Sequence, residues 1–182
     1  MDSMWLQSCI SCGTRCCRKF LVALTPYDVE RISRKLNKPA VEFVEAFPAE
    51  KCACVYAPIF WLYDDEFYIG MKRRDGGCIF LKDGRCAIHD FKPLVCRTFP
   101  YCIENGEIKK NPFCKNDVPK EADTYALLLL YENKLRLMRS DAIEWNLRTA
   151  GKRGLADLME FLRKKERERN RITKLISKCM VD

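Results

Sequence analysis

The stretch Cys9-Ile10-Ser11-Cys12-Gly13-Thr14-Arg15-Cys16-Cys17 concentrates four of the chain's twelve cysteines in one short segment. It opens with a Cys-x2-Cys pair, a spacing that presents two thiolates to one metal from a single tight turn. Eleven of the twelve cysteines fall between positions 9 and 114, since the cluster is followed by Cys52, Cys54, Cys78, Cys86, Cys96, Cys102 and Cys114. This density of thiols predicts a metal or iron–sulfur site.

Disulfide bonds are the first alternative explanation for so many cysteines. Residues 1–7 contain no basic stretch followed by an apolar run, which is the pattern of a secretory signal. We therefore expect a cytoplasmic protein, in which clustered thiols persist as metal ligands or as redox catalysts. The adjacent pair Cys16-Cys17 favours ligation, because a disulfide between neighbours would be strained. Disulfides and buried or redox thiols are the less favoured alternatives.

The composition is that of an ordinary globular protein, with 48% hydrophobic and 32% charged residues in 182. The longest apolar run, residues 126–131, is far shorter than the roughly 20 residues needed to span a bilayer. Of the net charge of +8, residues 161–178 contribute eight cations and two acids, or +6. This basic segment could bind RNA or an acidic partner, although nucleic acid is not the favoured interpretation.

The first regular element after the cysteine cluster is a predicted helix with Thr25 as its N-cap and Pro26 at its first position. Its apolar stripe is formed by Val29, Ile32 and Leu36. A second short helix is predicted from the helical spacing of Val41, Val44 and Phe47, ended by Pro48.

Residues 54–71 change to β-branched and aromatic types and predict a two-stranded hairpin that turns at Asp64-Asp65. A second tight turn at Asp83-Gly84 would bring Cys78 and Cys86 toward each other. Beyond Pro119 the pattern is helical, with a break at Gly151 and Gly154 and a last helix from about Leu155. The predicted fold class is α+β: a cysteine-rich metal-binding module with short helices and a β-hairpin over residues 1–118, followed by a helical scaffold with a basic C-terminal helix over residues 119–182.

The later cysteines lie far apart, with seven residues between Cys78 and Cys86, nine between Cys86 and Cys96, and seventeen between Cys96 and Cys114. A zinc ribbon would repeat the two-residue spacing, and neither a ferredoxin pattern nor the radical-SAM triad is present. Four thiolates satisfy a zinc ion or one cubane, and eight satisfy two. An anionic cluster would also suit the cations that flank these cysteines, which are Arg15, Arg18, Lys92 and Arg97.

The motifs, taken in order, resemble the CxxCxxCC-type zinc- or iron-chelating family over about residues 9–114. The resemblance rests on residues 9–17, Leu24-Thr25-Pro26-Tyr27-Asp28, Cys78-Ile79-Phe80-Leu81, Gly84-Arg85-Cys86-Ala87-Ile88-His89 and Lys92-Pro93-Leu94-Val95-Cys96-Arg97-Thr98-Phe99-Pro100. Two departures are Lys92 in place of the family's usual arginine and three residues, rather than two, between Cys12 and Cys16. The resemblance implies eight metal ligands: Cys9, Cys12, Cys16, Cys17, Cys78, Cys86, Cys96 and Cys114.

The remaining candidates receive structural interpretations. The single histidine, His89, is expected to pack or to form hydrogen bonds rather than to bind metal. Buried thiols are expected at Cys52, Cys54, Cys102 and Cys179. Residues 163–171 have no apolar position, so this part of the last helix is expected at the surface as a solvated strut whose charges pair with one another.

The leading functional prediction is an iron–sulfur protein with one or two clusters of the 4Fe-4S type, held by the eight cysteines in a redox or structural role. Members of the family are commonly called iron–sulfur or zinc proteins, and flagellin lysine-N-methylase contains a similar cysteine module. The resemblance thus implies a protein-lysine N-methylase-related module as one alternative, although no glycine-rich turn for S-adenosylmethionine is visible. The other alternative is a zinc-stabilised interaction module that binds an acidic partner or RNA through its basic helix.

Overall fold

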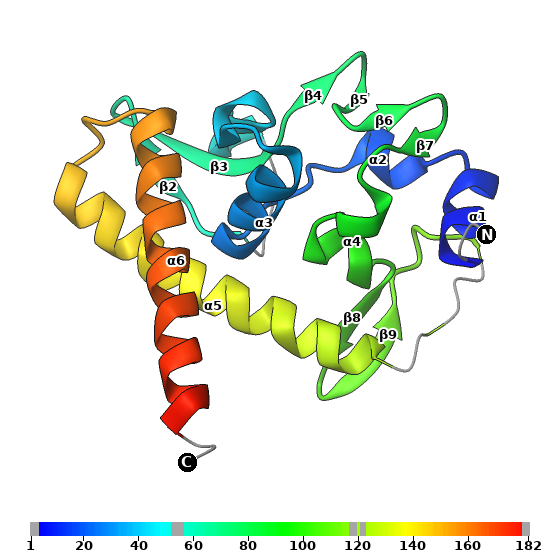
Figure 1. The fold of residues 1–182 in the computed structure, drawn as a ribbon. Helices are drawn as coiled ribbons and strands as arrows, with labels where there is room; N and C mark the ends of the chain where they lie inside the picture. Colours follow the sequence, from blue (N-terminus) through cyan, green and yellow to red (C-terminus); the bar gives the residue numbers. More distant parts are fainter. Residues whose placement is uncertain (1–3, 52–56, 117–119, 121–122, 180–182) are drawn as a thin grey trace.

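The computed structural model describes residues 4–51, 57–116, 120 and 123–179, and the fold is α+β with a helical C-terminal part, as predicted. The α-helices are α1 (Met4–Ser11), α2 (Arg15–Lys19), α3 (Pro26–Leu36), α4 (Leu94–Thr98), α5 (Thr124–Thr149) and α6 (Leu155–Cys179). Strands β1 (Val44–Pro48), β2 (Phe60–Leu62) and β3 (Asp65–Met71) form an antiparallel sheet in the order β1-β3-β2. Figure 1 shows α1 and α2 at one side of the molecule, the sheet and α6 at the other, and α5 running between the two sides. Within the described residues, none of the helices combines the length and apolar character that crossing a bilayer requires.

Helix α3 begins as the sequence predicts. The hydroxyl of Thr25 accepts a hydrogen bond from the Asp28 amide at 3.2 Å, and the Asp28 carboxylate accepts one from the Thr25 amide at 3.3 Å. Pro26 occupies the first turn, where no amide hydrogen is needed. The helix ends at Asn37, whose φ of 53° is left-handed.

The prediction of a second helix around Val41–Phe47 is wrong. Only Ala40–Glu42 form a single 3-10 turn, and Val44–Pro48 is strand β1, which pairs antiparallel with β3 from Val44↔Met71 to Pro48↔Phe67. The segment between Pro39 and Pro48 is too short for the spacing of its apolar residues to distinguish a helix from a strand. Its β-branched and aromatic side chains fit a sheet once a partner strand is available.

The predicted hairpin is confirmed in β2 and β3, with its turn one residue earlier than expected. Phe60 pairs with Phe67 and Leu62 with Asp65, so Tyr63 and Asp64 form the two-residue loop, with φ values of 53° and 65°. The tip of the hairpin contacts the connection between α5 and α6, where the Asp64 amide donates to the Gly151 carbonyl at 3.0 Å.

Three further two-stranded ribbons follow the sheet, and each closes through an Asp-Gly or Asn-Gly turn with positive φ at both residues. Asp75-Gly76 joins β4 (Arg73–Arg74) to β5 (Gly77–Cys78), Asp83-Gly84 joins β6 (Leu81–Lys82) to β7 (Arg85–Cys86), and Asn105-Gly106 joins β8 (Tyr101–Glu104) to β9 (Glu107–Lys110). The predicted turn at Asp83-Gly84 is therefore confirmed.

One hydrophobic core joins the sheet to α3, α5 and α6. Its members come from the cysteine-rich part and from the C-terminal helices, and include Ile32, Phe43, Phe60, Ile69, Met138, Leu158 and Leu162. The predicted break at Gly151 and the start of the last helix at Leu155 are confirmed. A second, smaller cluster around Tyr101 and Leu128 packs against Cys9 and Cys114.

The expectation that residues 163–171 cannot be buried is wrong at Glu166, whose side chain is only 1% exposed and pairs with Lys134 of α5 at 2.7 Å. The guanidinium of Arg169 donates two hydrogen bonds to the carboxylate of Asp141 in α5. On the other side, Arg163 and Arg167 both bind the carboxylate of Glu30 in α3, at 2.9 and 3.0 Å. The charges of this segment thus connect α6 to its neighbours instead of pairing only along the helix.

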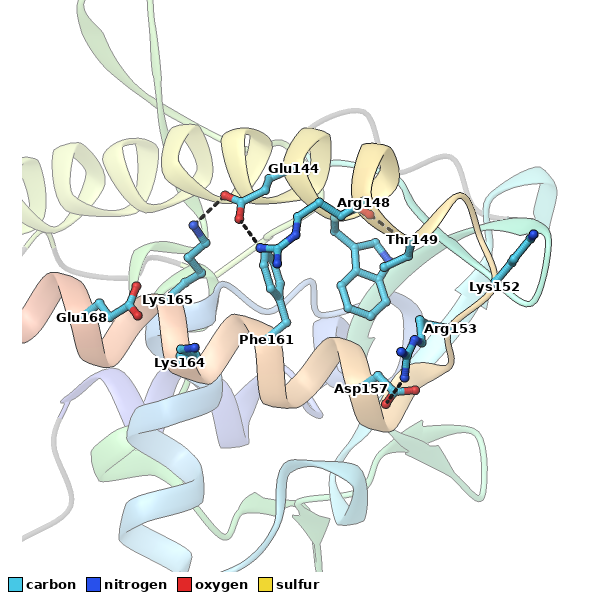
Figure 2. A pocket seen from close by; sticks show the side chains of 11 residues that line it. Glu144, Arg148, Thr149, Lys152, Arg153, Asp157, Phe161, Lys164, Lys165 and Glu168 are labelled. Carbon is cyan, nitrogen blue, oxygen red and sulfur yellow. Dashed lines mark hydrogen bonds and ion pairs between the residues drawn. The ribbon is translucent and has the colours of Figure 1, made fainter.

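The first turns of α6 are tied to the end of α5 in the same way. In the open cavity between the two helices, Glu144 of α5 binds Lys165 of α6 at 2.5 Å and Arg148 of its own helix at 3.0 Å (Figure 2). Trp145 and Phe161 line the same cavity, with ring centroids 5.5 Å apart. The proximal half of α6 is therefore held by both packing and charge.

Candidate metal centre

The N-terminal cysteines are presented by α1, α2 and the sharp turn between them. Gly13 and Thr14 both adopt left-handed conformations, with φ values of 66° and 54°, and the Thr14 amide donates to the Cys9 carbonyl at 3.1 Å. The two helices therefore meet at an angle that turns Cys9 toward Cys16 and Cys17. The amide of Gly13 donates to the Ile10 carbonyl at 3.0 Å, which closes the turn after α1.

Arg73 ties α2 to the first ribbon. Its guanidinium donates to the Phe20 carbonyl at 2.8 Å and the Arg18 carbonyl at 2.6 Å, and also to Gly76 at 3.0 Å. These contacts satisfy carbonyls at the C-terminal end of α2, where a cation is favourable. Arg73 is itself a residue of β4, and it pairs with Cys78 of the partner strand β5. Arg73 thus sets the position of Cys78 relative to Cys16 and Cys17.

Asp28 and Arg31 of α3 tie down the start of α4, which carries Cys96. The fully buried Asp28 carboxylate accepts a hydrogen bond from the Leu94 amide at 2.9 Å. It also accepts the two hydrogen bonds that the amide and the hydroxyl of Thr25 donate within the α3 cap. Arg31 donates to the Lys92 carbonyl at 2.6 Å and to Asp28 at 3.2 Å. The Thr-Pro-Tyr-Asp segment is therefore part of the site's support, although none of its residues carries a thiol.

Asn116 connects the last candidate cysteine to the first helix. Its side-chain amide donates to the Ser8 carbonyl at 3.0 Å and to the Ser11 hydroxyl at 2.7 Å. The neighbouring ring of Phe113 packs on Phe20 at 4.5 Å between centroids. These contacts hold Cys114 beside α1.

Six of the eight predicted ligands line one largely apolar cavity of about 100 Å³. They are Cys9, Cys16, Cys17, Cys78, Cys86 and Cys96. Among the described residues no three Cys, His, Asp or Glu side chains converge closely enough to hold a single metal ion, so the thiols surround a space rather than meet at one point. By volume that space would hold several water molecules.

The other two predicted ligands face a second cavity of about 100 Å³ next to the first. Cys12 and Cys114 line it together with Cys16, which belongs to both cavities. Its remaining wall is more polar and includes Arg15 and Asn116. The structure therefore divides the eight cysteines into a group of six and an outer pair.

Burial favours the neutral form of most of these thiols. It raises the pKa above the ordinary cysteine value at four of them, namely Cys9 (to about 11), Cys78, Cys86 and Cys96. The hydrogen bond between Cys17 and Cys16 lowers the pKa of Cys16 to about 7 and raises that of Cys17. A metal that binds here must displace protons from buried thiols, as thiolate ligation generally requires.

Lys92 is the buried cation of the larger cavity. Its side chain is 8% exposed, it lines the cavity, and its positive charge favours the thiolate form of Cys9, Cys16, Cys86 and Cys96. The ammonium lies 3.1 Å from Nε2 of His89. His89 therefore contacts Lys92, in keeping with the hydrogen-bonding role expected for it.

Cys102 lies outside both cavities, and the expectation that it is a buried thiol is wrong. It is exposed on β8, with its sulfur 3.7 Å from the Lys109 carbonyl. Successive side chains of a strand face opposite sides, and the side chain of Cys102 lies on the side of this two-stranded ribbon that faces solvent. Cys52 and Cys54 lie outside the described residues, as does the side chain of Cys179.

Comparison with known proteins agrees with a metal site built by this part of the chain. No curated protein and no solved structure matches the sequence. A family model does match residues 8–115, more than half of the chain, and these residues include all eight predicted ligands, the whole lining of the larger cavity and all of the smaller one except Asn116. The model is CxxCxxCC, described as a putative zinc- or iron-chelating domain. The chain therefore belongs to the CxxCxxCC family and is a metal-binding protein of that zinc- or iron-chelating type.

Proposed function

We propose that the chain binds one iron–sulfur cluster of the 4Fe-4S type in the larger cavity, through four of the six thiols that line it, in the reducing cytoplasm. The observation that carries this proposal is the number of thiols that line a single cavity. A tetrahedral zinc site holds four sulfurs about 2.3 Å from the ion and hence about 3.8 Å from one another. Six thiols around about 100 Å³ fit a larger, multinuclear centre better than one ion.

The electrostatics of the cavity support the same assignment. A cubane with four thiolate ligands carries net negative charge, which a buried cation stabilises. Lys92 supplies that cation, and most of the surface that lines the cavity around the sulfurs is apolar. Because the thiols come from α1, α2, β5, β7 and α4, ligation also contributes to the stability of the fold.

Metal and sulfide analysis of protein purified without exposure to air tests the proposal. We expect brown protein with broad absorbance near about 400 nm and about four iron and four sulfide per chain. One zinc per chain with no sulfide would contradict the cluster and favour a zinc-stabilised module. About eight iron per chain would contradict the single-cluster assignment and place a second cluster on the outer pair together with the two thiols of the larger cavity that the first cluster leaves free.

A further inference from the structure

The distal part of α6 carries an apolar stripe that nothing in the described structure covers. Ile172, Leu175 and Ile176 are 56%, 56% and 54% exposed. They lie three and four residues apart, so they share one side of the helix. Figure 1 shows the last turns of α6 extending past α5 and away from the body of the molecule. Single exposed apolar side chains are common, but a contiguous group on one face indicates a contact surface.

The charges around this stripe differ from those of the proximal half of α6. Residues 169–178 contain four cations and no acid. Arg169 is bound to Asp141, but within the described residues neither Arg171 nor Lys174 has an ion-pair partner. Both line an open groove between α6 and α3, together with Arg34. The acid in that groove, Glu30, already binds Arg163 and Arg167.

We propose that the stripe and its flanking cations are the docking surface for an acidic amphipathic helix of another protein. Such a helix would cover the three aliphatic side chains with its own apolar face and would bring carboxylates to Arg171 and Lys174. The proposal is independent of the metal that the cysteines bind.

Two other occupants fit the same surface less well. A second copy of this chain would place cations against cations, because residues 169–178 offer no acid for either copy to bind. A single-stranded RNA would satisfy Arg171 and Lys174, but its bases stack best on aromatic side chains, and the stripe offers only aliphatic ones. The combination of an aliphatic stripe with unpaired cations favours the acidic helix.

The test uses the full-length, metal-loaded protein and a labelled synthetic helix of about five turns, with leucines along one face and glutamates beside them. Fluorescence anisotropy should show binding that weakens as salt rises from about 50 to 500 mM. The triple variant Ile172→Ala, Leu175→Ala, Ile176→Ala and the double variant Arg171→Glu, Lys174→Glu should each bind about tenfold or more weakly. The visible spectrum and metal content should not change, because none of these residues lines either cavity and the last turns of α6 lie away from α1, α2 and α4 (Figure 1).

Matched controls separate this surface from general attraction to a basic protein. Ile143→Ala with Leu147→Ala removes two aliphatic side chains that are 63% and 80% exposed on α5, and Lys82→Glu with Lys152→Glu reverses two exposed cations elsewhere. Both control variants should bind the acidic helix as the wild type does, and a helix with lysines in place of its glutamates should not bind.

Four results would overturn the proposal. Equal weakening in the control variants would show that the charge of the whole molecule attracts the probe. Binding of the lysine helix would show an apolar contact without charge recognition. A labelled uridine oligonucleotide that binds more tightly than the acidic helix, with a loss in the double variant alone, would assign the surface to RNA. Self-association in light scattering that the alanine variant abolishes would assign it to a second copy.

Discussion

At the scale of single residues, the cations that flank the cysteines in sequence have different roles in space. Lys92 enters the larger cavity, whereas Arg97, one position after Cys96, lies outside both cavities. Arg15 lies over the ring of Phe113, 5.1 Å from its centroid. Closeness to a cysteine in sequence therefore does not identify the cation whose charge favours the thiolate forms. The distinction depends on burial, which the sequence does not show.

This difference leads to a prediction about Lys92. Lys92→Met keeps the approximate length of the side chain but removes the cation, so in the iron–sulfur cluster that we propose the reduced, more anionic state would lose more stabilisation than the oxidised one. We expect a more negative reduction potential, by roughly 60 mV for each 1.4 kcal/mol of lost attraction. Anaerobic redox titration of the visible spectrum measures it. Arg97→Met is the matched control, and an equal shift in both variants would contradict the role of Lys92.

A second prediction divides the cysteines. Cys86→Ser and Cys96→Ser should lower the iron content and the stability, because both thiols line the larger cavity and ligation contributes to folding. Cys12→Ser and Cys114→Ser should keep the iron of the wild type, since these thiols face the smaller cavity. Iron and sulfide counts after anaerobic purification measure the outcome.

Cys102→Ser is the control for substitution itself, because Cys102 is exposed and outside both cavities. Equal loss of iron in Cys12→Ser and Cys86→Ser would show that the two cavities act as one centre. Iron loss in Cys102→Ser would show that the ligand set is wrong.

At the scale of elements, local sequence predicted those features whose cause is local. The cap of α3 follows from Thr25, Pro26 and Asp28 alone. The turn Asp83-Gly84 follows from the positive φ that this pair accepts, and Asp75-Gly76 and Asn105-Gly106 carry the same signal for the other two ribbons. Reading all three pairs would have predicted the series of ribbons that presents Cys78 and Cys86. Strand β1 could not be predicted in this way, because its conformation depends on pairing with β3.

The cap of α3 also leads to a prediction. Asp28→Ala would remove the carboxylate that accepts from the Thr25 amide in the α3 cap and would leave the buried Leu94 amide without its acceptor, so we expect a loss of about 3 kcal/mol in the free energy of unfolding. Metal content should fall with it, because the start of α4 positions Cys96. Denaturant unfolding and metal analysis measure the two effects. Glu42→Ala, which removes an exposed pair with Lys38, should change stability by less than about 0.5 kcal/mol.

A metal content unchanged in Asp28→Ala would contradict the support that we assign to α3. A large loss of stability in Glu42→Ala would show that the effect is not specific to the cap.

At the scale of the whole molecule, the contacts that assemble the site join residues far apart in sequence. Arg73 reaches carbonyls more than fifty positions earlier, and Asn116 reaches Ser8 more than one hundred positions earlier. The eight cysteines could be selected from the family motifs, but their division between two cavities depends on these long-range contacts. No local pattern in the sequence marks Arg73 or Asn116 as a support of the site.

The attachment of α6 to α3 should depend on pH. Burial alone would raise the pKa of Glu30, but hydrogen bonds from Arg163 and Arg167 outweigh it and hold the pKa below its usual value. A lowered folded-state pKa means that the contribution of Glu30 is complete above the unfolded value of about 4.3 and is lost as pH falls through the folded value. The difference in unfolding free energy between wild type and Glu30→Gln should therefore shrink below about pH 4.3.

Denaturant unfolding of both proteins from neutral to acid pH measures this difference. Glu168→Gln, an exposed substitution on α6, should show no such pH dependence. A difference for Glu30→Gln that is constant with pH would contradict the ion pairs as its cause.

The spread of the thiols along the chain has a consequence for synthesis in the cell. The larger cavity takes thiols from residue 9 to residue 96, so it cannot close until Cys96 has been made and has left the ribosome. Until then Cys9, Cys16 and Cys17 have none of the later thiols beside them, and α5 and α6 do not yet exist to cover the sheet. The full set of thiols can therefore bind metal only after residues 9–96 have all been made. The supply of metal, rather than the speed of translation, would then determine how much of the newly made protein reaches its native state.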